Sequence, residues 1–196
     1  MILKMNRRIF IAIDISDEAR RAVSDYTEIL RRKFRHLRIG WEKTEKLHLT
    51  LKFLGETNEK QLDDLTNILE KTAAQFSAFK LQIAGTGVFP GPGNPRILWL
   101  GVTDETNSLS KISELLETKC ASVGFKREKR KFKAHLTVAR LREPHKSREI
   151  AEKHIENNFE SVEFEASEIV IYESKLQPAG SVYETISKFE FAKSKP

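Results

Sequence analysis

One nine-residue pattern occurs twice in this sequence. Residues 46–54 read KLHLTLKFL and residues 133–141 read KAHLTVARL, with five of the nine positions identical. Polar and apolar residues alternate through both copies, which is typical of half-buried strands. Because residues i and i+2 of a strand face the same way, each copy presents an imidazole beside a hydroxyl: His48 with Thr50, and His135 with Thr137. The fold must therefore accommodate two equivalent strands of this kind.

The elements around the motifs repeat as well. Periodicity and capping residues predict a strand over 8–14, a helix over 17–35 that Ser16 caps, a strand over 47–54, a helix over 59–77 that Thr57 or Asn58 caps, and a strand over 79–89. After the turn-forming residues 90–95, the second half follows with a strand over 96–100, a helix over 105–122, a strand over 134–141, a helix over 146–157, and strands over 161–173 and 181–191. The first strands lie 88 residues apart and the histidines 87, which favours a duplicated unit.

These elements predict one α+β domain over residues 1–196, with two repeat halves at about 6–90 and 95–190. Alternating strands and helices leave a parallel sheet open. The half-buried pattern of the motif strands favours antiparallel sheets, so we expect the helices to pack on the outside.

Composition constrains the binding partner and the cellular compartment of the protein. Lysine and arginine outnumber acidic residues 34 to 28, for a net charge of +6, which suits a polyanionic partner such as RNA without demanding one. The single cysteine, Cys120, excludes an internal disulfide and a multi-cysteine metal site and fits a reducing cytosol. The apolar run at 9–13 is too short for a signal peptide, and no segment approaches the roughly 20 apolar residues of a membrane span. We expect a cytoplasmic protein outside the membrane.

The residue types in the motifs suit acid–base chemistry on a phosphate ester. The ordinary pKa of histidine, roughly 6.5, allows one imidazole to be neutral and another protonated near neutral pH. A neutral histidine can take a proton from water while a charged one protonates a leaving oxygen, and the two threonine hydroxyls can donate to phosphate oxygens. This chemistry requires no cofactor. A cyclic phosphodiester is a fitting substrate because its leaving group stays tethered and its ring is strained.

Other interpretations of the histidines are weaker. Two histidines can bind zinc, but catalytic zinc usually has three protein ligands, and no such triplet accompanies either motif, so we expect no metal. Serine, cysteine and P-loop chemistries lack their motifs. The remaining histidines, His36, His145 and His154, are interpreted as structural or exposed.

The paired motifs resemble those of the 2H phosphoesterase superfamily, and the chain is most similar to its RNA 2′,3′-cyclic phosphodiesterases, also called 2′-5′ RNA ligase-like. The strings LHLTLKFLG at 47–55, RILWLG at 96–101 and HLTVAR at 135–140 carry this resemblance, which spans about residues 6–190. It implies a bilobed fold with pseudo-twofold symmetry, in which two antiparallel sheets face a central cleft. It also implies metal-independent hydrolysis of an RNA-terminal 2′,3′-cyclic phosphate to a 2′-phosphomonoester, with His48 as proton donor and His135 as base.

The resemblance further implies two substrate-binding residues, each five positions after a motif histidine: Phe53 for the terminal base and Arg140 for the phosphate. An odd spacing places them on the opposite strand face from the histidines, so we expect a strand end or a bend there. The implied partner is RNA with a cyclic phosphate end, tRNA fragments included, bound by a monomer. The basic segment 126–133 is either an RNA backbone contact or a solvated loop. A relative acting on another cyclic or 2′-5′ linkage and a non-catalytic RNA-binding module stay open as alternatives.

Overall fold

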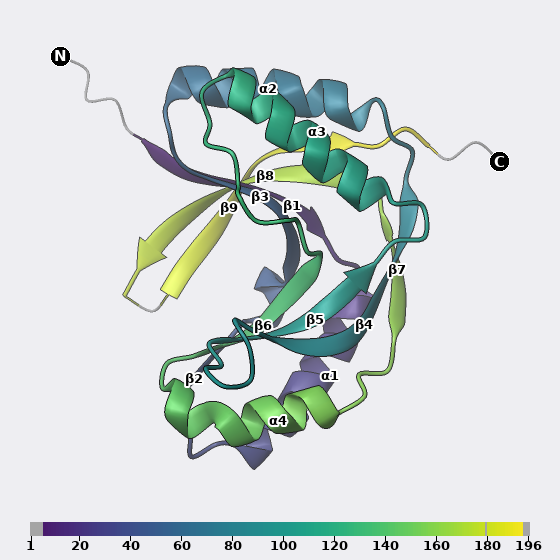
Figure 1. Cartoon of the computed structure of the whole chain (residues 1–196). Coiled ribbons are helices and arrows are strands. Elements are labelled where there is room, and N and C mark those ends of the chain that lie inside the picture. Colours follow the sequence, from purple (N-terminus) through teal and green to yellow (C-terminus); the bar gives the residue numbers. More distant parts are fainter. Residues whose placement is uncertain (1–5, 179, 194–196) are drawn as a thin grey trace.

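The computed structural model describes residues 6–178 and 180–193, and it forms two antiparallel sheets with helices on their outer faces (Figure 1). The four-stranded sheet has the order β3-β1-β8-β9, and the five-stranded sheet has the order β2-β6-β5-β4-β7. The strands are β1 (Arg7–Asp14), β2 (Ile39–Trp41), β3 (His48–Thr57), β4 (Phe79–Phe89), β5 (Ile97–Thr103), β6 (His135–Leu141), β7 (Val162–Ala166), β8 (Glu168–Gln177) and β9 (Gly180–Glu190). The helices are α1 (Asp17–Lys33), α2 (Glu59–Ala73), α3 (Ser108–Ser122) and α4 (Arg148–Glu156). The predicted fold class is confirmed.

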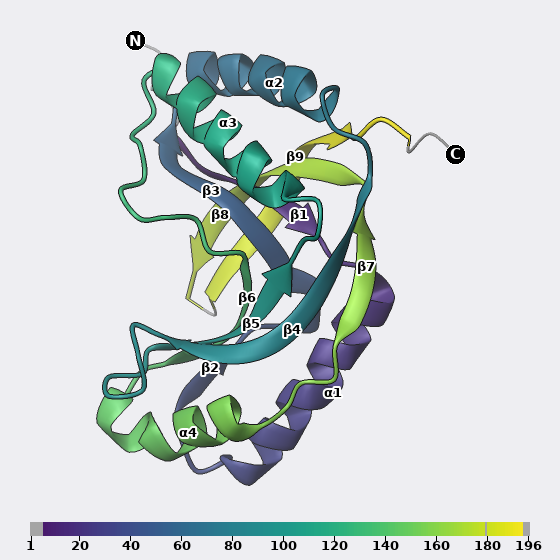
Figure 2. The same cartoon turned by 45° about the vertical axis from the view of Figure 1, so that its right-hand side comes forward.

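The helices form two outer layers. Helices α2 and α3 lie over the four-stranded sheet, whereas α1 and α4 lie over the five-stranded sheet (Figures 1 and 2). Both predicted caps are present: the Ser16 side chain accepts from the Ala19 N–H at 3.1 Å, and Asn58 forms a reciprocal capping box with Gln61. The apolar stripes of the helices and the inner faces of the strands form one hydrophobic core.

The two halves of the chain exchange strands. Strand β1 lies between β3 and β8, which comes from the C-terminal half, whereas β5 lies between β6 and β4, which comes from the N-terminal half. In each case the fourth strand of one half lies beside the first strand of the other. The motif strands β3 and β6 therefore occupy equivalent places in two facing sheets, and neither sheet is complete without both halves.

One predicted strand needs correction, and one strand was missed. The single strand expected over 161–173 is two strands, β7 and β8, which belong to different sheets and are separated at Ser167. The adjacent polar residues Ser167 and Glu168 interrupt the alternation at this point, but so short an interruption does not show that the two segments join different sheets. Strand β2 was not predicted, because a three-residue strand is too short for a periodic signal.

Each motif strand carries a β-bulge at the same position. In β3, Thr50 pairs with Ala12 and Lys52 with Ile11, which leaves Leu51 as the extra residue. In β6, the residues before and after Val138 pair with Trp99 and Leu98, which leaves Val138 extra. Since a bulge adds one residue to the strand, the fifth residue after each histidine returns to the histidine's face. The bend expected from the odd spacing is therefore present in both strands.

Candidate active site

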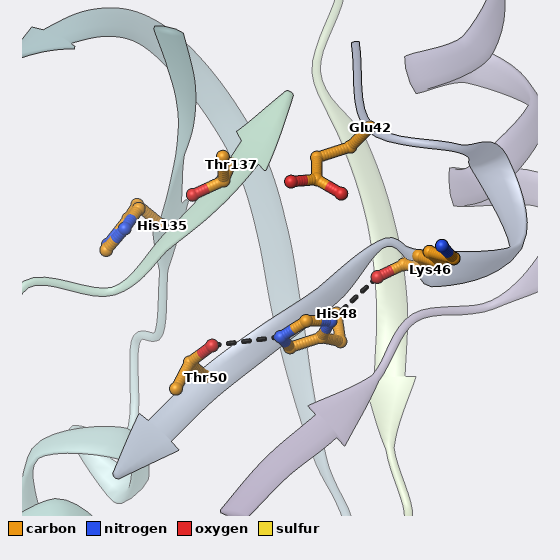
Figure 3. A pocket seen from close by; sticks show the side chains of 6 residues that line it. All are labelled: Glu42, Lys46, His48, Thr50, His135 and Thr137. Carbon is orange, nitrogen blue, oxygen red and sulfur yellow. Dashed lines mark hydrogen bonds between the residues drawn. The ribbon is translucent and has the colours of Figure 1, made fainter. Parts of the chain in front are cut away.

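The two motifs meet in one pocket between the sheets. Its lining consists of Glu42, Lys46, His48, Thr50, His135 and Thr137, and Figure 3 shows the two motif strands on opposite sides of it. The structure thus brings together all four residues that the repeated motif singled out. They come from strands 87 residues apart in the sequence.

The two histidines have the same hydrogen-bond geometry. His48 Nδ1 lies 2.7 Å from the Lys46 carbonyl oxygen, and His135 Nδ1 lies 2.7 Å from that of Lys133. A carbonyl only accepts, so both Nδ1 atoms carry a proton and donate it. This leaves each Nε2 for proton exchange, and that of His48 lies 3.0 Å from the Thr50 hydroxyl.

The charges around the histidines differ. Burial lowers the pKa of both below the ordinary 6.5. For His48, the carboxylates of Glu42 and Asp14 oppose this and raise the pKa, with Arg20 acting the other way. For His135, the cations Lys133 and Arg140 lower the pKa further. The neighbouring charges, apart from burial, therefore favour the proton on His48 over His135.

Aromatic rings enclose both imidazoles. The His48 ring lies 4.9 Å from Phe10 and edge-on to Tyr183 at 5.3 Å. The His135 ring lies edge-on to Phe89 at 5.0 Å, with Trp99 beyond it. These contacts reduce the rotational freedom of the imidazoles and exclude water from one side of each.

A glycine makes room for the indole beside His135. Gly87 pairs with Trp99 across β4 and β5, and a Cβ on Gly87 would lie 2.0 Å from the indole ring. The Lys133 ammonium lies 4.0 Å from the centroid of the same ring, where it makes a cation–π contact. The sequence pattern alone gave no sign of this arrangement.

Two pocket residues were not singled out from the sequence. Lys46 carried a signal, because Lys46 and Lys133 occupy the same place in the repeated pattern. Glu42 had no signal in the sequence, because it follows the short strand β2 and reaches the pocket only through the pairing of β2 with β6.

The two further sequence candidates lie beside the pocket rather than in its lining. Phe53 is 52% exposed and stacks on Phe10, with ring centroids 5.9 Å apart. Arg140 Nε lies 3.3 Å from Glu42 Oε1. Phe53 is thereby connected to His48 through Phe10, and Arg140 reaches the pocket through Glu42.

A third histidine lies outside the pocket and has a structural role. His154 is fully buried, and its ring nitrogens lie 2.8 Å from the Tyr26 hydroxyl and 3.0 Å from the Trp99 carbonyl oxygen, as expected of a structural histidine. Among the described residues, no three His, Cys, Asp or Glu side chains are grouped so that they could hold a metal ion. In the same residues, every helix is too short or too polar to span a bilayer.

Comparison with known proteins identifies the family. The model of the 2′-5′ RNA ligase superfamily matches residues 16–177. The chain belongs to this superfamily of 2H phosphoesterases. RNA 2′,3′-cyclic phosphodiesterases from Archaeoglobus fulgidus and Methanothermobacter thermautotrophicus are similar to it, with 35% and 33% identity over 93% and 94% of this chain and 99% of each relative. A crystal structure from Thermus thermophilus covers 96% of this chain and 100% of its own, with 26% identity and a TM-score of 0.79. The family expected from the sequence is confirmed.

Proposed function

We propose that this protein is an RNA 2′,3′-cyclic phosphodiesterase that yields a 2′-phosphomonoester without a metal ion. The observation that carries the proposal is the pocket, where two histidines with fixed tautomers and two threonines converge from facing sheets. The printed names of the A. fulgidus and M. thermautotrophicus relatives support the same substrate. We further propose that it acts as a monomer on RNA ends, tRNA fragments among them.

In the proposed mechanism, the two histidines act on opposite sides of the phosphorus, one as a base and the other as an acid. His135 Nε2 takes a proton from water, and the water oxygen forms a bond to phosphorus. The bond to the 3′ oxygen breaks, and protonated His48 Nε2 gives its proton to that oxygen. The Thr50 and Thr137 hydroxyls donate to the non-bridging oxygens as their negative charge grows. The carboxylates near His48 and the cations near His135 favour this division of roles.

Phe53 and Arg140 are the proposed substrate contacts outside the pocket. The bulges place both on the cleft face of their strands. The exposed Phe53 ring offers a stacking surface for the terminal base, a contact of about 1–3 kcal/mol. The Arg140 guanidinium, 59% exposed and next to Glu42, is available to a phosphate oxygen.

The proposal is tested with an oligonucleotide that ends in a 2′,3′-cyclic phosphate, incubated in excess chelator. We expect a 2′-phosphate product at a rate that chelator leaves unchanged. Loss of activity in chelator and its recovery with zinc would contradict the metal-free mechanism. Binding of the oligonucleotide without turnover would instead indicate an RNA-binding module, and cleavage of 2′-5′ linkages alone would indicate a different phosphodiesterase.

A further inference from the structure

The Arg8 guanidinium lies on the exposed ring of Phe53. Its central carbon is 5.1 Å from the centroid of that ring. Arg8 lies on β1, two residues before Phe10. The Phe10 ring lies between those of Phe53 and His48. The order across this face is therefore His48, Phe10, Phe53 and Arg8, and it leads away from the pocket along the four-stranded sheet.

Arg8 differs from two other arginines, Arg7 and Arg140, because each of those two has a carboxylate partner. The adjacent Arg7 lies 2.7 Å from the Glu173 carboxylate, and Arg140 lies 3.3 Å from Glu42. Within residues 6–178 and 180–193, Arg8 forms no ion pair, although Glu56 stands opposite it in the register of β3. Since a guanidinium uses its flat face on an aromatic ring, its N–H edge stays available for a planar or tetrahedral anion.

Tyr183 links this position to the catalytic pocket. Its ring is edge-on to both His48, at 5.3 Å, and Phe10, at 5.0 Å. Burial raises the pKa of Tyr183, while the charges of Arg140 and Arg8 oppose the shift. Tyr183 thus contacts both His48 and Phe10, the first two residues of the series that leads to Arg8.

These contacts point to a second anion subsite. We propose that Arg8 binds the phosphodiester on the 5′ side of the terminal nucleotide, while the terminal cyclic phosphate lies between the histidines. The rings of Phe10 and Phe53 lie between the two sites, with centroids 4.9 Å from His48 to Phe10 and 5.9 Å from Phe10 to Phe53, and the terminal nucleoside would span them. This inference rests on the proposed function and narrows its substrate class: an RNA end is preferred over a free nucleoside cyclic phosphate, which has no such phosphodiester.

The test compares two substrates in the full-length enzyme. One is a nucleoside 2′,3′-cyclic phosphate and the other is a dinucleotide that ends in the same group. We expect Arg8→Gln to lower the dinucleotide-to-mononucleotide ratio of kcat/KM about tenfold, the effect of removing one exposed charge-assisted hydrogen bond. Arg7→Gln is the matched control, because it removes the same charge from the neighbouring residue that Glu173 already pairs, and it should leave the ratio unchanged.

A neutral linkage provides the second arm. With the wild-type enzyme, a dinucleotide whose internal linkage is a methylphosphonate should have a kcat/KM about tenfold below that of the charged dinucleotide. With Arg8→Gln, the charged and neutral dinucleotides should have the same kcat/KM. This arm keeps the proposal testable with wild-type protein if Arg8→Gln folds poorly. An unchanged ratio for the Arg8 variant, or equal activity of wild-type enzyme on charged and neutral linkages, would overturn the subsite. Failure of wild-type enzyme on both substrates would instead refute the proposed function.

Discussion

At the scale of single residues, His48 and His135 share a hydrogen-bond pattern but not an electrostatic environment. Each donates Nδ1–H to a carbonyl two residues earlier, so the motif itself treats them alike. Glu42 and Asp14 are what distinguish His48, and neither lies in the repeated pattern. The sequence therefore singles out the pair of histidines, whereas their proposed roles as acid and base depend on neighbours that only the fold supplies.

The first prediction concerns loss of either imidazole. His48→Ala or His135→Ala should each lower kcat by several orders of magnitude, because each removes one of two coupled proton transfers. The double variant should be little worse than either single variant, since the two groups act as a unit. Single-turnover rates measure this, with circular dichroism as the control for folding. Near wild-type turnover by either variant would refute the two-histidine mechanism.

The second prediction concerns pH. kcat/KM should follow a bell whose optimum lies below pH 6.5, because burial lowers the pKa of both histidines below that ordinary value. Activity falls at low pH as the base His135 becomes protonated, and at higher pH as the acid His48 loses its proton.

Glu42→Gln tests the assignment of the two limbs. The variant removes a charge that raises the pKa of His48, so the alkaline limb should move to lower pH while the acid limb stays. Lys133→Gln is the counterpart: it removes a charge that lowers the pKa of His135, so the acid limb should move to higher pH. Movement of the opposite limb in each variant would reverse the acid and base assignment.

At the scale of elements, periodicity predicted most strands and helices but not their partners. The motif strands and the caps at Ser16 and Asn58 were predictable because they depend on nearby residues. The break at Ser167, the strand β2 and the exchange of β4 and β8 between sheets were not, because long-range pairing decides them. The bulges were partly visible: the odd spacing to Phe53 and Arg140 required a bend, and the strand pairing gave its form.

The third prediction concerns a buried ion pair behind the bulge in β3. The Lys52 side chain is 3% exposed, and its Nζ lies 2.5 Å from Glu117 Oε1 on α3. The other Glu117 oxygen accepts from the Glu128 N–H at 3.0 Å, so one carboxylate fixes both the strand and the basic loop. Glu117→Gln should lower the free energy of unfolding by about 3 kcal/mol, because it leaves Lys52 buried without its counter-charge.

Urea unfolding at neutral pH measures this cost. Glu114→Gln is the matched control, since Glu114 is exposed on the same helix and its change should stay within about 0.5 kcal/mol. Equal stability of the two variants would show that water or a relaxed Lys52 side chain replaces the ion pair.

At the scale of the whole molecule, the strand exchange makes the cleft a property of both halves together. Each sheet contains strands from both sides of residue 95, so neither half buries its apolar face alone. The two motif strands are held in facing positions by this shared core. We therefore propose that residues 6–190 act as a single domain in which site geometry and global stability are coupled.

The basic loop extends this coupling to the substrate. Residues 126–131 are exposed, and the hydrogen bond from the Glu128 backbone to Glu117 fixes the start of the loop. The chain then leads through Lys133 into the second motif. A loop that is anchored at one end and enters the pocket wall at the other is placed to contact RNA beyond the terminal nucleotides.

The fourth prediction tests that interaction with RNA. Changing Lys129, Arg130 and Lys131 to glutamine should weaken binding of a long oligonucleotide and reduce the salt dependence of log Kd by ~0.7 for each phosphate that the loop no longer neutralises. Turnover of a nucleoside cyclic phosphate should barely change, because that substrate is too small to reach the loop. Fluorescence titration across a salt series measures both the affinity and its slope.

A charge-matched control separates local binding from net charge. The variant with Lys60, Lys71 and Lys119 changed to glutamine loses the same three charges from exposed positions on α2 and α3, the helices outside the cleft. It should keep most of the affinity, because counterion release depends on the cations that meet the phosphates rather than on the total. Equal weakening by both triple variants would mean that net charge alone attracts the RNA. Loss of mononucleotide turnover in the loop variant alone would mean that the loop shapes the pocket through Lys133 and His135.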